Sequence, residues 1–179
     1  MSPDIEIIGD GCAALSLAAR ASELNHNIRL IKPSNAPTTN DHVWGFWSDP
    51  ILAAAQRLAR ATWQKWAIIT HNDCAVLSSE TRPYNAFKRS DWSEHCKGLA
   101  ELSKVTIIAE HEWEKSADSL LFDTRPPVVP NDCMLQHFQG IEVKTKQPCF
   151  DKDMAILMDF RVDQSKGMHF IYLLPYSTT

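Results

Sequence analysis

The chain has 179 residues, a length that fits one domain and allows a hydrophobic core to be buried. Its net charge is −4 and it contains no basic run, so nothing in it indicates a nucleic-acid partner. Five scattered cysteines without C-x-x-C spacing argue against a disulfide framework and against zinc, and seven well-separated histidines indicate no metal site.

The start of the chain is an apolar strand, which begins at Ile5 without a basic and apolar leader. No apolar run approaches the roughly 20 residues that a membrane-spanning helix needs. We therefore expect a cytoplasmic protein, with peripheral attachment to a membrane left open.

Residues 4–34 have the layout of a dinucleotide-binding βαβ unit: strand, glycine turn, helix and strand. Here Gly9 would permit the tight turn, Gly11 would let the backbone approach a pyrophosphate, and Ala14 would keep the helix close to the sheet. The N-terminus of that helix would face the phosphates. The predicted cofactor-binding turn is therefore Gly9, Asp10, Gly11, Cys12, Ala13 and Ala14. The alternative is a glycine turn that only packs a helix onto a sheet.

The end of the second strand departs from this pattern. An acidic residue normally stands there and accepts a hydrogen bond from a ribose hydroxyl, but this chain has Lys32 followed by Pro33. A lysine has no acceptor, so Lys32 would either lie near a phosphate or be solvated. The ribose contact is left without a candidate.

An aromatic cluster follows directly, with Trp44, Phe46 and Trp47 in the stretch 41–47. It is either a set of core side chains under a loop or the aromatic wall of a pocket that could bind a polyene or face a carbocation. Similarly, His42 either lines such a pocket beside Trp44 or is a hydrogen-bonded loop histidine.

The middle of the chain alternates between strand and helix patterns. Ser48 or Asp49, followed by Pro50, marks the start of a helix at 51–60, and Ser90-Asp91 caps a second helix at 92–102. The predicted strands are a hairpin of 63–70 and 75–77 with its turn at 71–73, a short strand at 84–87, a buried strand at 105–109 and a strand at 120–125.

The last part of the chain predicts an antiparallel sheet of three strands, at 136–146, 155–162 and 169–174. Alternation in the middle strand places Ile156, Met158 and Phe160 on one face, and Asp159 with Arg161 on the other. Asp159 is the best candidate for a catalytic carboxylate in these residues. An ion pair with Arg161 is the alternative, and it would lower the Asp159 pKa and make Asp159 a poor acid.

Taken together, these motifs resemble the N-terminal part of a lycopene β-cyclase of the bacterial flavoprotein type. The resemblance covers essentially the whole chain in order, and its most specific pieces lie at 157–164 and 170–175. The matching stretches are the glycine turn, His42 to Phe46, Phe122 to Pro126, Gln136 to Glu142, Leu157 to Gln164 and Phe170 to Pro175.

The resemblance implies an α/β fold: an FAD/NAD(P)-binding Rossmann-like βαβ domain interleaved with an antiparallel-sheet substrate domain, here truncated. The nucleotide domain would comprise 1–40 and 84–127, with Asp123 where a strand meets the flavin and with Lys32 and Arg125 as further cofactor-binding residues. The incomplete substrate domain would comprise 41–83 and 128–179, with His42, Trp44 and Phe46 lining the pocket. The main catalytic acid would lie beyond Thr179, which leaves Asp159 as the candidate within the chain.

The resemblance also implies an isomerase: the ends of lycopene, or of a related carotenoid, would close into β-ionone rings without net redox change. The implied cofactors are FAD, kept reduced, and NAD(P)H. Such chemistry needs an acid, a pocket that tolerates a cation, a base, and exclusion of water. Two other readings stay open: an FAD-dependent isoprenoid reductase or hydroxylase, and a non-catalytic dinucleotide-binding remnant.

Overall fold

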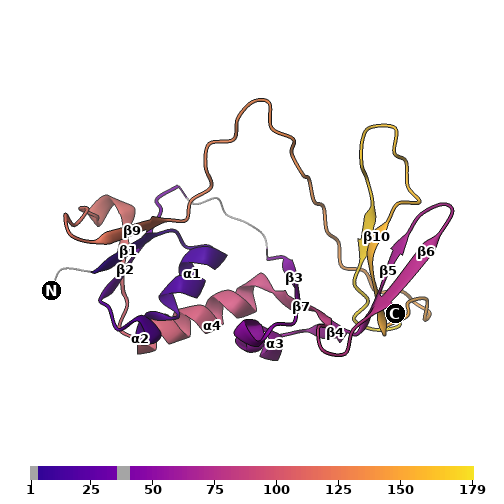
Figure 1. Cartoon of the computed structure of the whole chain (residues 1–179), viewed down its shortest axis with the longest axis horizontal. Helices are drawn as coiled ribbons and strands as arrows, with labels where there is room; N and C mark the ends of the chain where they lie inside the picture. The colour runs from indigo at the N-terminus through magenta and orange to yellow at the C-terminus, as the bar shows by residue number, and fades with distance from the viewer. Residues whose placement is uncertain (1–3, 36–40) are drawn as a thin grey trace. The chain divides into compact units, whose positions relative to one another are not determined.

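The computed structural model describes residues 4–35 and 41–179, which form two compact units (Figure 1). Unit 1 lies within 1–41 and 89–138, and unit 2 comprises 42–88 and 139–179. Each unit therefore takes two separate stretches of the chain. The mixed α/β class with a parallel sheet, predicted from the sequence, is confirmed.

Unit 1 is built on a parallel sheet in the order β8-β2-β1-β9. Parallel strands need crossover connections, so the strands of this sheet are separated along the chain. Helices lie in the connection between β1 and β2 and in the stretch that leads to β8. The strands are β1 (Ile5–Ile8), β2 (Ile28–Lys32), β8 (Thr106–Ala109) and β9 (Leu120–Asp123).

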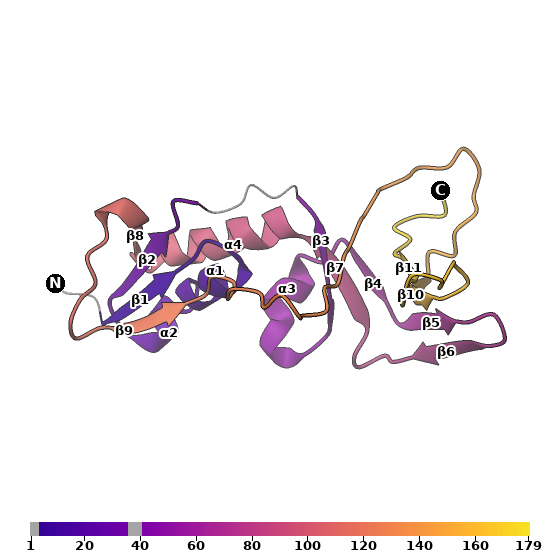
Figure 2. The same cartoon turned by 90° about the horizontal axis from the view of Figure 1, so that it is seen from above.

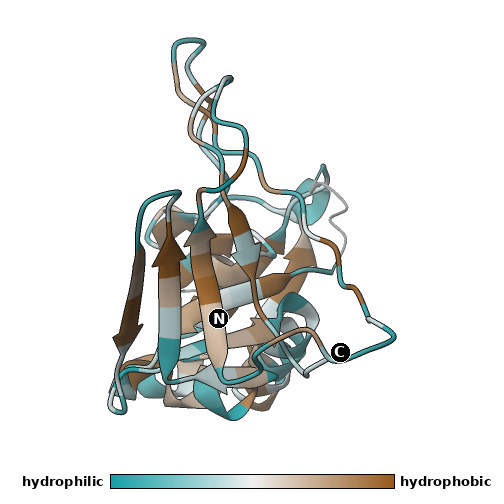
Figure 3. Ribbon diagram, turned by 90° about the vertical axis from the view of Figure 1, so that its right-hand side faces the viewer, coloured by the Kyte–Doolittle hydropathy of each residue, from teal (hydrophilic) through white to brown (hydrophobic). Residues whose placement is uncertain are grey.

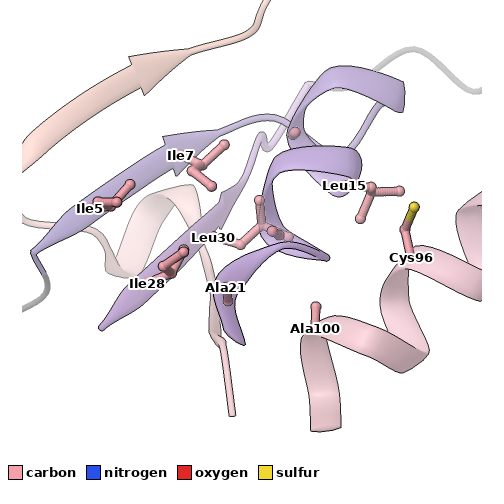
Figure 4. Close-up of a cluster of buried hydrophobic side chains, with 10 residues drawn as sticks. Ile5, Ile7, Leu15, Ala21, Ile28, Leu30, Cys96 and Ala100 are labelled. Carbon is pink, nitrogen blue, oxygen red and sulfur yellow. The ribbon is translucent and has the colours of Figure 1, made fainter. Parts of the chain in front are cut away.

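Apolar side chains of β1 and β2 pack against the helices to form the core of unit 1 (Figure 4). Leu15 of one helix and Cys96 and Ala100 of another are almost fully buried there. Asn25, in the left-handed region at φ 53°, ends the second helix. The helices are α1 (Cys12–Ala18), α2 (Ala21–Leu24), α4 (Arg89–Leu102) and a 3-10 turn, η2 (Glu110–Glu112).

Strand β8 is an edge strand, and the prediction that it is buried is wrong. Its Ile107 is 47% exposed. A run of apolar residues indicates a strand but does not say whether another strand or a helix covers both sides of it.

Unit 2 contains an antiparallel sheet in the order β3-β7-β4. Residues 84–88, which the sequence grouped with the nucleotide domain, form its central strand. As predicted, Asp49 caps the following helical segment by accepting the Ile51 N–H at 3.1 Å. The elements are β3 (Val43–Trp47), η1 (Pro50–Leu52), α3 (Ala53–Arg57), β4 (Ala61–Trp63) and β7 (Tyr84–Lys88).

A second sheet of unit 2 has the order β11-β10-β5-β6 and is mixed rather than purely antiparallel. Figure 2 shows its strands β5 and β6 side by side. The predicted β5–β6 hairpin is confirmed, but β10 pairs with β5 in parallel. The strands are β5 (Lys65–Ile69), β6 (Cys74–Ser78), β10 (Met154–Asp159) and β11 (Ile171–Leu173).

Two predictions for this sheet are wrong. Residues 136–146 form no strand, and Phe138 and Ile141 there are 80% and 82% exposed. The alternation of apolar and polar residues in this stretch was therefore not enough to make it pair with another strand. The register of β10 shifts between Ile156 and Met158, which interrupts the predicted alternation of faces at Leu157. Figure 3 shows that much of the hydrophobic colouring lies on the strands.

Candidate functional site

The glycine turn of unit 1 joins β1 to α1 and has the geometry that a phosphate-binding turn needs. Gly9 has φ +141°, a region that side-chain-bearing residues rarely adopt, and a Cβ there would lie 2.1 Å from Thr124 Oγ1. A Cβ on Gly11, in contrast, would meet nothing within 4 Å. Ala14 is fully buried and lies close to Gly9. One glycine is thus required by packing and the other leaves its backbone open.

The outer part of the turn faces solvent. Gly11, Cys12 and Ala13 are exposed and Asp10 is half-buried. Asp10 also lines an open groove of about 680 Å³ whose other walls are residues of α4 with mixed charges: Arg89, Ser90, Ser93, Glu94, Lys97, Gly98 and Glu101. A pyrophosphate therefore has access to the backbone of the turn, and this arrangement fits the nucleotide part of a flavin cofactor.

Thr124 ties the end of β9 to the turn. Its N–H and its hydroxyl both donate to the carbonyl oxygen of Ile8, at 2.9 and 2.8 Å. The Gly9 N–H donates to the Ile31 carbonyl at 3.0 Å. These bonds fix the carboxyl end of β1, where ligands of open parallel sheets bind.

The predicted residues Asp123 and Arg125 form an ion pair at the same edge of the sheet. The Arg125 Nε and Nη2 donate to the Asp123 carboxylate at 2.9 and 2.6 Å, and these hydrogen bonds lower the pKa of Asp123. The Arg125 Nη1 also donates to Glu110 at 2.9 Å. Lys32, at the end of β2, is exposed. Sequence reasoning missed Glu110, which follows β8 directly.

The predicted pocket residues His42, Trp44 and Phe46 do lie together in unit 2. The Trp44 indole N–H donates to His42 Nε2 at 2.8 Å. Trp44 and Phe46 point to one face of β3, where both contact Phe87 edge-to-face at centroid distances of 5.9 and 5.3 Å. His42 is therefore a hydrogen-bonded histidine, which was one of the two interpretations of this residue. The aromatic side chains form a packed cluster.

The opposite face of β3 carries a second aromatic cluster that the sequence did not reveal. Trp47 contacts Trp66 and Tyr84 at 4.5 and 4.9 Å between ring centroids, and Tyr172 donates a hydrogen bond to the Tyr84 hydroxyl. A Cβ on Gly45 would collide with that Tyr84 hydroxyl. A glycine within an aromatic strand was the signal for such a close approach.

Asp159 ends β10 and is paired with Arg161. The Arg161 Nε and Nη2 donate to its carboxylate at 2.9 and 2.7 Å, and the Arg161 backbone N–H donates at 3.0 Å. The side-chain hydrogen bonds from Arg161 lower the pKa of Asp159 to about 2. A carboxyl group in this state is ionised at neutral pH and cannot donate a proton to an alkene.

Two observations concern other kinds of site. Across 4–35 and 41–179, no group of three or more His, Cys, Asp or Glu residues is arranged to hold a metal ion. Within those same ranges, no helix is both long enough and apolar enough to cross a membrane.

Comparison with known proteins gives a family match over almost the whole chain. A model of the family described as "Lycopene cyclase protein" matches residues 4–179. A search of curated proteins gave no match.

Solved structures give more distant likenesses. The Y270A mutant of 2-methyl-3-hydroxypyridine-5-carboxylic acid oxygenase has 17% identity and a TM-score of 0.49, over 61% of this chain and 32% of that one. A geranylgeranyl bacteriochlorophyll reductase-like protein from Thermoplasma acidophilum has 16% identity and a TM-score of 0.42, over 60% and 30%. This chain thus spans about a third of the length of each structure.

Proposed function

Because the chain belongs to the lycopene cyclase protein family, we propose that it forms part of a flavoprotein that cyclises the ends of lycopene, or of a related carotenoid, to β-ionone rings. The family match over residues 4–179 is the observation that carries this proposal. The product would have the same mass as the substrate, because the proton added to the terminal double bond is balanced by a proton that a base removes after ring closure.

The glycine turn supports the nucleotide-binding part of the proposal. Gly9 and Ala14 would hold the turn against the sheet, and the open backbone at Gly11 would contact the pyrophosphate of FAD. When bound, reduced FAD would supply the flavin chemistry at the polyene end, with NAD(P)H as the proposed source of reducing equivalents. Asp123 and Arg125 lie at the same sheet edge and would contact the cofactor from β9.

The aromatic side chains support a role in polyene binding. Trp44 and Phe46 are half-buried, so part of each ring surface is available to an apolar substrate. Aromatic faces attract cations through the quadrupole of the ring, which suits a reaction that passes through a carbocation. His42, as the acceptor for the Trp44 N–H, would orient that indole.

Asp159 would act as a positioning residue rather than as the acid. Its hydrogen bonds with Arg161 keep it ionised, so the proton for the terminal double bond would come from another group. A substrate this apolar also suggests contact with a membrane surface, which we propose as peripheral attachment.

The test is an anaerobic incubation of the whole flavoprotein, of which this chain forms part, with lycopene and FAD, reduced either with dithionite or with NADPH. We expect a product of unchanged mass with a shortened chromophore, identified by mass spectrometry and absorption. A gain of two hydrogens would identify a reductase instead. Tight FAD binding with no lycopene turnover under either reductant would favour the non-catalytic remnant and overturn the cyclase proposal.

A further inference from the structure

Strand β2 of unit 1 ends in a lysine and not in the acidic residue that usually accepts a hydrogen bond from a ribose. Ligands of open parallel sheets bind outside the carboxyl ends of the strands, and a ribose hydroxyl usually donates to an acidic residue at the end of the second strand. Here β2 ends in the exposed Lys32, whose ammonium group has donors only.

Glu110 brings a carboxylate to this position from the neighbouring strand. In the parallel register of β2 and β8, Lys32 lies opposite Ala109, so Glu110 follows at the same edge of the sheet. The Ser34 N–H donates to Glu110 Oε2 at 2.9 Å. The Glu110 carboxylate therefore lies against the chain just beyond the end of β2.

The carboxylate of Glu110 is held from a second side as well. The Arg125 Nη1 donates to Oε1 at 2.9 Å, and Arg125 is itself held by Asp123. Each carboxylate oxygen can accept more than one hydrogen bond, and the Glu110 side chain remains 29% exposed. The Glu110 carboxylate is thus held in place and can still accept a hydrogen bond from a ligand.

We propose that Glu110 is the ribose-binding residue of this site: it accepts a hydrogen bond from the 2′-hydroxyl of the adenosine ribose, in place of the acidic residue missing from β2. This inference rests on the proposed nucleotide binding. The contact with the ribose, which Lys32 at the end of β2 cannot make, would be made by Glu110, which follows β8 directly.

The experiment compares ADP with 2′-deoxy-ADP by isothermal titration calorimetry, because the two probes differ in one ribose hydroxyl. A hydrogen bond to a charged group predicts that the wild-type protein binds ADP about tenfold or more tightly than 2′-deoxy-ADP. In Glu110→Ala the two affinities become equal. In Glu110→Gln, which keeps the shape and an oxygen acceptor but loses the charge, the ratio falls severalfold.

The matched control is Glu112→Ala, since Glu112 is an exposed carboxylate on the same 3-10 turn. We expect the control to keep the wild-type ratio. Adding Lys32→Glu to Glu110→Ala restores a preference for ADP, because it puts an acceptor at the end of β2.

The outcomes separate this inference from the proposed function. A wild-type protein that binds neither ADP nor FAD refutes the nucleotide site itself. A wild-type protein that binds FAD and ADP but shows no preference for the 2′-hydroxyl overturns the role of Glu110. A Glu110→Gln protein with an unchanged ratio overturns it too, and that variant keeps the side-chain volume if Glu110→Ala should fail to fold.

Discussion

Replacing Gly9 with alanine tests whether packing, rather than ligand binding, requires this glycine. The added Cβ would lie 2.1 Å from Thr124 Oγ1 and 3.1 Å from the Ala14 Cβ, on a backbone at φ +141°. Holding a side-chain-bearing residue in such a region costs of order 1–3 kcal/mol.

The collision adds a second cost. Thr124 would have to rotate away, and its hydroxyl would lose the 2.8 Å hydrogen bond to the Ile8 carbonyl, which contributes about 1 kcal/mol. The two costs together predict that Gly9→Ala lowers the free energy of unfolding by about 2–4 kcal/mol.

Urea denaturation followed by circular dichroism measures this loss, with Gly11→Ala as the matched control. A Cβ at Gly11 meets nothing within 4 Å, so its effect on stability should stay below about 1 kcal/mol. In an FAD titration the order of the two variants should be reversed. Under the proposed function the pyrophosphate lies against Gly11, so a methyl group there should weaken FAD binding about tenfold or more.

A double-mutant cycle identifies the colliding atom. Thr124→Ala removes Oγ1, so in that background the further cost of Gly9→Ala should shrink by about 1 kcal/mol. If the free energy of unfolding of Gly9→Ala lies within about 0.5 kcal/mol of the wild-type value, the packing argument is wrong. This margin is roughly the error to which the effects of substitutions at independent sites add.

Three further substitutions test other parts of the structure. Gly45→Ala places a Cβ against the Tyr84 hydroxyl and should cost about 1–3 kcal/mol in urea denaturation, with a changed near-ultraviolet circular dichroism spectrum; an unchanged spectrum would contradict the close approach. Burial raises the pKa of Glu6, but hydrogen bonds from Ser119, Trp113 and Ser116 outweigh burial and the pKa lies below 4.5, so Glu6→Gln should cost at least about 2 kcal/mol at pH 7. A carboxyl group whose pKa is lower in the folded state than in the unfolded state stabilises the fold at pH values above the unfolded-state pKa. The cost of Glu6→Gln should therefore shrink as the pH falls below 4.5, and an equal cost at pH 7 and pH 3.5 would refute this account of Glu6. Removing the guanidinium of Arg161 should return the Asp159 pKa from about 2 toward 3.8 in a carboxyl NMR titration, and an unchanged midpoint would contradict the pairing.

Local patterns predicted the parts of the fold that depend on neighbouring residues. The glycine turn was visible because Gly9 and Gly11 stand between an apolar strand and a helical pattern, and the β5–β6 hairpin was visible from its turn residues. The roles of the predicted site residues toward a cofactor or a substrate stay predictions.

Contacts between distant residues could not be read from the sequence. The parallel pairing of β5 with β10, the close approach of Tyr84 to Gly45, and the position of Glu110 beside Ser34 each join residues far apart in the chain. Alternation at 136–146 was equally local evidence, and it failed because a strand needs a partner.

The pairing of β5 with β10 also sets an order of events during synthesis. Lys65 is made long before Met154, its partner in the sheet, and the whole of residues 89–138 is synthesised between them. The first unit can therefore close while the β5–β6 hairpin still lacks its neighbour, and the edge of β5 that pairs with β10 is then left without hydrogen-bond partners. A nascent chain stalled before Met154 would thus present this hairpin to chaperones, and its capture should end once β10 has emerged from the ribosome.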